Sequence, residues 1–150
     1  MVDNDTHDIA VLNNLITTTI DSAEGYVEAA KRIDNVYISG SFMRWSADRQ
    51  HAADALKAQV SALGGDPEIQ GTLVGSAHRL VAKLHEIMSS CDDAIIDEGV
   101  CSENRVNHKY EEALKDPTLS APTRGVIERS YISVLAGHKQ ACALKRSGHA

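Results

Sequence analysis

Apolar residues recur along most of the chain at alternating steps of three and four positions. This spacing places them on one face of an α-helix, which has about 3.6 residues per turn. Five segments carry the pattern, and we expect helices at about residues 8–33, 36–63, 73–89, 93–114 and 120–145. The strict alternation of apolar and polar residues that marks a strand is absent over any useful length. The sequence therefore predicts an all-α protein.

Capping and helix-breaking residues stand near the expected helix ends. Asp5 or Thr6 is expected to cap the first helix, and Asp34-Asn35 separates it from the second. Gly64-Gly65 should end the second helix, and Pro122 fits the first turn of the last. The first two helices would each be on the order of 40 Å long, and the short break between them predicts an antiparallel hairpin.

Length and charge narrow the class of protein. A chain of 150 residues is predicted to be one domain, with residues 1–7 and 147–150 as flexible termini. The net charge is −6, with acidic and basic residues interleaved, which argues against a nucleic-acid-binding surface. No apolar run approaches the roughly 20 residues that a membrane span needs. The sequence therefore predicts neither nucleic acid nor membrane as a partner.

The cysteines and the first residues indicate the compartment. The three cysteines are odd in number and include no CxxC pair, so reduced thiols are the simplest interpretation. The first seven residues are polar and acidic, unlike a signal peptide. We therefore expect a cytoplasmic protein.

Two charged residues interrupt the apolar stripes. Arg49 lies between Trp45 and Ala52 on the stripe of the second helix, and Glu103 lies on that of the fourth. An isolated buried charge is costly, so each should have a partner. Glu24 stands at the edge of the first stripe. Because a guanidinium has five donors, Arg49 could bridge Glu24 and Glu103 in a structural polar network.

A metal site is the main alternative for these residues. Bundles that bind two metal ions gather carboxylates and Glu-x-x-His pairs from several helices, and such sites suit iron or manganese. Asp48-x-x-His51 has this spacing, and the candidate ligands are Glu24, Asp48, His51, Glu103 and His138. The positive charge of Arg49 would oppose a bound cation. If the helices are rotated from this interpretation, the same residues would face solvent.

Motifs for catalysis are missing. The sequence has no Ser-His-Asp ordering, phosphate-binding glycine loop or nucleophile elbow. No catalytic residue and no organic cofactor are therefore assigned, and enzyme activity stays undecided.

Several short motifs together resemble a known family. They are Leu12-Asn13-Asn14-Leu15-Ile16 with Glu24-Gly25-Tyr26, Asp48-Arg49 through Leu56, Leu63-Gly64-Gly65 with Gly71-Thr72-Leu73-Val74-Gly75, and Glu103 with Tyr110. Over roughly residues 9–114 the chain resembles a bacterial ferritin-like four-helix-bundle family of unknown function. The resemblance implies an antiparallel four-helix bundle with an additional helix in the crossover, and no established activity. Val100 stands where the family commonly has a further Glu, which weakens the metal hypothesis.

Three functions follow from these observations. The first is a cytosolic bundle with a structural polar network and no enzymatic role. The second is an iron- or manganese-binding carboxylate protein with a redox or storage role. The third is an interaction module that forms a homodimer through an apolar helix face at Val36, Tyr37, Ile38 and Met43.

Overall fold

The structure is a computed structural model that describes residues 2–69 and 104–148 of the chain. Helices form nearly all of this part, which contains no strand. They are α1 (Val2–Ala30), α2 (Val36–Ala62), a helical segment at 104–114, and α5 (Ala121–Gly148). The all-α prediction is confirmed for these residues. The helix expected at 73–89 and the first part of the one expected at 93–114 lie outside them.

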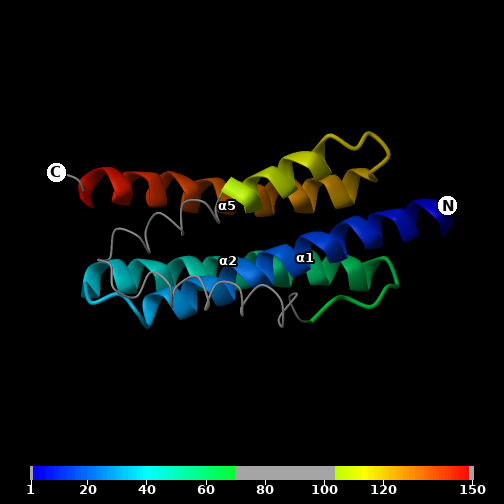
Figure 1. Ribbon diagram of the computed structural model, residues 1–150. Coiled ribbons are helices and arrows are strands. Elements are labelled where there is room, and N and C mark those ends of the chain that lie inside the picture. The colour runs from blue at the N-terminus through cyan, green and yellow to red at the C-terminus, as the bar shows by residue number, and fades with distance from the viewer. Residues whose placement is uncertain (1, 70–103, 149–150) are drawn as a thin grey trace.

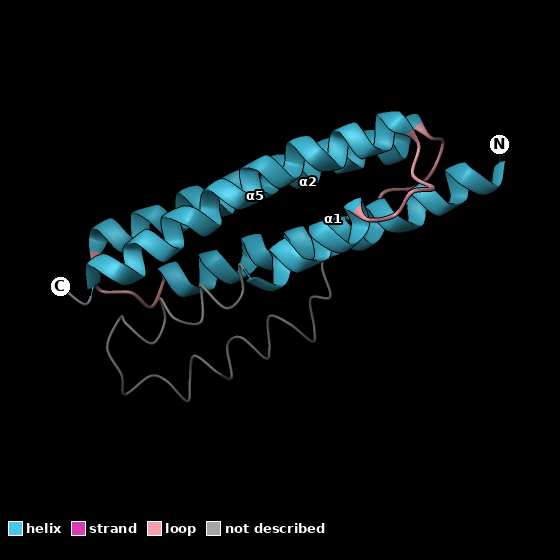
Figure 2. Cartoon of the chain, turned by 90° about the horizontal axis from the view of Figure 1, so that it is seen from above, coloured by secondary structure: helices cyan, strands magenta, loops and turns pink. Residues whose placement is uncertain are grey.

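The helices run side by side as two hairpins (Figure 1 and Figure 2). One hairpin is α1 with α2, and the other is the 104–114 segment with α5. The hairpins meet where α2 packs along α5 in the opposite direction. None of the helices in the described ranges is long and apolar enough to cross a lipid bilayer.

The apolar stripes meet in two buried clusters. The larger one joins both hairpins and contains Leu12, Leu15, Ile16, Ile20, Ala53, Leu56, Val60, Val106, Tyr110, Leu119, Ile127 and Val134. The smaller one lies near the turn between α1 and α2, where Tyr26 packs edge-on against Phe42 and Trp45, with ring centroids 5.3 and 5.5 Å away. The stripe predicted for the second helix is buried from Phe42 to Val60.

Both ends of α2 are capped by residues that the sequence marks as breaks between helices. The Asn35 side chain accepts hydrogen bonds from the backbone N–H groups of Tyr37 and Ile38, at 3.0 and 3.3 Å. At the other end Gly64 has a φ of +81°, a conformation that glycine adopts without strain. The N–H of Gly65 then reaches the carbonyl of Val60 at 3.0 Å, which is the bond of a Schellman motif.

The predicted start of the first helix is wrong. We expected a cap at Asp5 or Thr6, but α1 already begins at Val2. Its first turns contact the loop before α5: the Asn4 amide donates to the Thr118 carbonyl at 3.3 Å, and His7 Nε2 lies 2.6 Å from Asp116 Oδ2. These long-range contacts stabilise helical turns that local propensity leaves undecided.

Candidate functional site: the buried arginine

Arg49 is the largest side chain that is wholly buried in the described part of the chain. Its exposed fraction is 0%, and it stands on α2 between the buried residues Trp45 and Ala52. The predicted inward orientation of Arg49 is therefore confirmed. Arginine is charged at any physiological pH, so the interior must solvate a permanent cation here.

The guanidinium group of Arg49 reaches across to α5. Nη1 donates to the carbonyl of Ser133 at 3.5 Å, and Nη2 donates to the carbonyl of Val134 at 3.4 Å. Both distances are at the long end for a hydrogen bond. These carbonyls belong to an α-helix, so the guanidinium uses their second lone pairs. The positive charge is thus placed against the partial negative charge of two backbone dipoles.

Two further polar contacts connect α2 and α5 on either side of Arg49. The indole N–H of Trp45 donates to the side-chain oxygen of Gln140, and the amide of Gln59 donates to the hydroxyl of Thr123 at 3.3 Å. As residue numbers rise along α2 they fall along α5, so the three contacts share one antiparallel register.

Tyr110 belongs to the same interior. Its hydroxyl lies 2.7 Å from that of Thr19, and the Thr19 hydroxyl donates to the Leu15 carbonyl at 2.6 Å. Burial raises the pKa of Tyr110 to about 12, while the positive charge of Arg49 opposes this rise. Tyr110 is therefore a neutral hydroxyl at physiological pH.

The proposed ligands are not all placed in the interior. Glu24 on α1 is half-buried, and its pKa is raised by desolvation and then by the nearby charge of Asp21. Asp48 and His51 are exposed, because they flank Arg49 on a helix whose Arg49 face points inward. Glu103 and the side chain of His138 lie outside the described residues.

No set of three or more His, Cys, Asp or Glu side chains in the described part of the chain is arranged to hold a metal ion. The metal site and the bridge from Arg49 to Glu24 and Glu103 both stay predictions.

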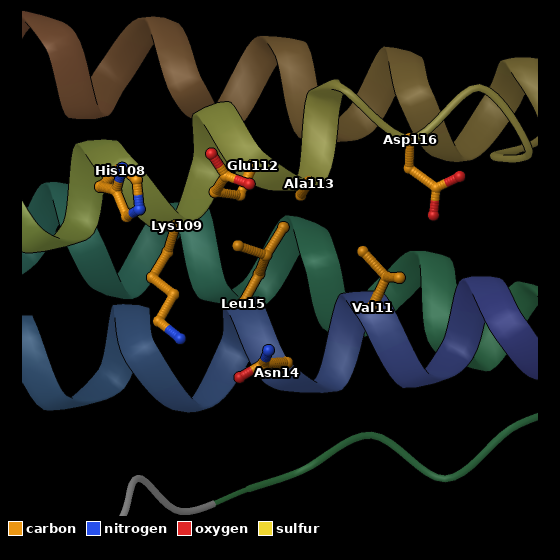
Figure 3. A pocket seen from close by; sticks show the side chains of 8 residues that line it. All are labelled: Val11, Asn14, Leu15, His108, Lys109, Glu112, Ala113 and Asp116. Atoms are coloured by element: carbon orange, nitrogen blue, oxygen red, sulfur yellow. The ribbon is translucent and has the colours of Figure 1, made fainter.

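A surface hollow of about 280 Å³ lies between α1 and the 104–114 segment (Figure 3). It is lined by Val11, Asn14, Leu15, His108, Lys109, Glu112, Ala113 and Asp116. Its apolar floor comes largely from α1, and Lys109 extends from the other segment toward α1.

The two carboxylates at the rim of this hollow are held ionised. A hydrogen bond from Lys115 at 2.9 Å lowers the pKa of Glu112. Hydrogen bonds from Thr118 and then from His7 lower the pKa of Asp116 to about 2. A general acid needs a pKa near the working pH, so neither group is suited to that role.

Comparison with known families shows the family to which the chain belongs. Residues 7–116 match the family described as Domain of unknown function (DUF2383). The chain belongs to this family. No match is found among curated proteins. The DUF2383 match covers α1 from residue 7 onward and all of α2, including Arg49, and it ends at Asp116, before α5 begins.

The sequence did not reveal the α5 residues that accept hydrogen bonds from Arg49. Ser133 and Val134 bind through backbone carbonyls, which carry no residue-type signal. A second missed residue is Asp8, which is wholly buried. Its Oδ2 accepts from the hydroxyl and the N–H of Ser120, at 2.5 and 3.3 Å. Asp8 thus supports the start of α5, where a negative charge is favourable.

Proposed function

We propose that the protein is a cytoplasmic, non-enzymatic helix bundle of ferritin-like type, in which Arg49 is the centre of a structural polar network. The observation that carries this proposal is the full burial of Arg49 with its donors directed at α5 carbonyls. In this role Arg49 joins the α1–α2 hairpin to the hairpin that contains α5.

The chain direction of the helices supports the ferritin-like type. α2 and the 104–114 segment point the same way, as expected for helices joined by a long crossover (Figure 1). Ferritin-like bundles have one such connection, and their other neighbouring helices are antiparallel. Here α1 is antiparallel to α2, and the 104–114 segment is antiparallel to α5.

The chemistry of Arg49 favours a structural role over a ligand-binding one. A guanidinium cannot coordinate a metal ion and repels cations nearby. Its planar group of donors can instead bond several fixed acceptors at once. Backbone carbonyls of a helix are such acceptors, because they do not move or titrate.

Replacement of Arg49 by alanine tests the structural role. Arg49→Ala should lower the free energy of unfolding by about 2–4 kcal/mol, because it removes charged hydrogen bonds and leaves a cavity. Urea unfolding followed by circular dichroism measures this change.

Arg44→Ala is the matched control, since Arg44 is exposed on the same helix and donates to Ser41 at 3.2 Å. It should change the stability by less than about 0.5 kcal/mol. Equal effects of the two substitutions would refute a special role for Arg49.

The metal-binding role is the rival proposal, and half-buried Glu24 is less exposed than Asp48 and His51, the other ligand candidates whose side chains the structure describes. It would use iron or manganese held by Glu24 with Asp48, His51, Glu103 or His138. Elemental analysis of the purified protein distinguishes the two. About one metal ion per chain, lost on Glu24→Ala without loss of the fold, would favour the rival. The structural proposal predicts no stoichiometric metal.

An interaction role has its own supporting observation. Val36 and Tyr37 at the start of α2 are 84% and 90% exposed, and Met43 is 49% exposed. Neighbouring exposed apolar side chains can form the kind of patch that marks a contact surface. If a second copy of the chain binds here, Tyr37→Ser should shift light-scattering mass from dimer to monomer. A monomer before substitution would refute this role.

A further inference from the structure

A glycine on α5 lies directly beside the guanidinium of Arg49. Gly137 is buried, and a Cβ built on it would lie 2.5 Å from Nη2 and 3.3 Å from both Cζ and Nη1 of Arg49. Cβ atoms almost never lie within 3.0 Å of such an atom, so a side chain at this position would require Arg49 or α5 to move. The space taken by any other side chain at this position is therefore occupied by the guanidinium.

The position of Gly137 on its helix explains the fit. Side chains of an α-helix lean toward its N-terminus, so a residue covers the turn three and four positions before it. For residue 137 that turn holds Ser133 and Val134, whose carbonyls accept from Arg49. A missing Cβ at residue 137 leaves these two carbonyls open to the guanidinium.

We propose that Gly137 and the carbonyls of Ser133 and Val134 form a seat for the Arg49 guanidinium, and that this seat sets the register of α5 on α2. The inference deepens the proposed structural role of Arg49 and rests on it. A slip of α5 by one turn would place Ser133 or Ala141 opposite Arg49, and each has a Cβ. The contacts Trp45–Gln140 and Gln59–Thr123 agree with the register that the seat requires.

The guanidinium cannot simply move aside. Arg49 has no exposed surface, so a swing away from Gly137 would break its bonds to α5 and bury its charge elsewhere. A side chain at position 137 should therefore displace α5 from α2. Glycine within a helix normally destabilises it, so its presence here needs such a reason.

The test compares the effect of Gly137→Ala on Tm in two backgrounds, one with Arg49 and one with Arg49→Met. With Arg49 present, Gly137→Ala should lower Tm by at least about 4 °C, because the added methyl group overpacks the seat. In the Arg49→Met background the guanidinium is gone. There the same substitution should raise Tm by about 1–4 °C, as alanine usually does in a helix.

Gly125→Ala is the matched control on α5, since its Cβ would meet the end of the flexible Arg129 side chain at 3.3 Å. It should raise Tm in both backgrounds. Gly40→Ala is a second control, because no atom lies within 4 Å of its Cβ position.

A second readout follows the register itself. Trp45 is the single tryptophan of the chain, and its indole contacts Gln140, one turn from Gly137. Gly137→Ala should shift Trp45 fluorescence to longer wavelength in the folded protein, whereas Gly125→Ala should not.

The outcomes separate the two proposals. If Gly137→Ala raises Tm with Arg49 present, or lowers it equally in both backgrounds, the seat is overturned. If Arg49→Ala leaves urea stability unchanged, the structural role of Arg49 fails, whatever Gly137 does.

Discussion

Thr19 and Tyr110 share a buried hydrogen bond, and Thr19 has a second hydrogen bond, to the backbone. Their hydroxyl oxygens are 2.7 Å apart, and Thr19 also lies 2.6 Å from the Leu15 carbonyl. A hydroxyl has one proton, so when Thr19 donates to Leu15, Tyr110 must be the donor to Thr19. Removing the Thr19 hydroxyl and removing the Tyr110 hydroxyl should therefore lower the free energy of unfolding by different amounts.

The expected cost differs between the two substitutions. Tyr110→Phe removes one donor, and Thr19 keeps its own bond to Leu15. This should cost about 1 kcal/mol, the net worth of a typical hydrogen bond. Thr19→Val leaves the wholly buried Tyr110 hydroxyl without its acceptor. An unsatisfied buried group costs about 1–3 kcal/mol, so Thr19→Val should be the more damaging change.

Urea unfolding of both single variants and of the double variant measures the asymmetry. The double variant should lose less than the sum of the single losses, because no orphaned hydroxyl remains. Thr18→Val is the control, since the Thr18 hydroxyl donates only along its own helix, to Asn14 at 3.1 Å, in an exposed setting. A Tyr110→Phe loss as large as that of Thr19→Val would refute the assigned direction of the bond.

Three other predictions concern the same bundle. In urea unfolding, Asp8→Ala should lower the unfolding free energy by about 1–2 kcal/mol, because Ser120 at the start of α5 loses its acceptor. The control Asp5→Ala, at an exposed position, should cost less than about 0.5 kcal/mol. Burial raises the pKa of Tyr110 from 10.0 to about 12, so the unfolded chain loses this proton first. The contribution of Tyr110 to stability is therefore intact below pH 10 and is lost as the pH rises toward 12. When urea midpoints are measured against pH, Tyr110→Phe should reduce the decline in stability over this pH range. Glu103→Ala should destabilise by about 3–5 kcal/mol if this residue pairs with the buried arginine, and near-neutral stability would remove Glu103 from the network.

The sequence predicted the buried faces well because helical periodicity is a local property. The stripe through Phe42, Trp45, Arg49, Ala52 and Leu56 is buried as a whole, including its charged member. An arginine at this register had to face inward if the stripe did. The Asn35 cap and the Gly64 helix end likewise depend on a few adjacent residues.

The partners of Arg49 could not be predicted in the same way. Pairing by charge predicted carboxylate partners, and that prediction stays untested. It gave no indication of the two α5 backbone carbonyls, which any residue would provide. The spacing of Asp48 and His51 suggested ligands, but residues beside an inward-facing position point elsewhere on the helix. Gly137 did leave a signal, since a glycine inside a helix needs an explanation, but its neighbour across the bundle is known only from the fold.

The start of α1 shows a further limit. Local capping residues suggested a start near Asp5, but contacts with a loop more than a hundred residues away extend the helix to Val2. Such contacts depend on the assembled bundle and leave no periodic trace in the sequence.

The central claim is that the interior around Arg49 is occupied by a structural cation and not by a metal site. Anomalous scattering from crystals soaked in iron or manganese addresses it most directly. We expect no anomalous peak inside the bundle, and electron density for the guanidinium against the carbonyls of Ser133 and Val134. A peak coordinated by Glu24 together with Glu103 or His138 would contradict the account.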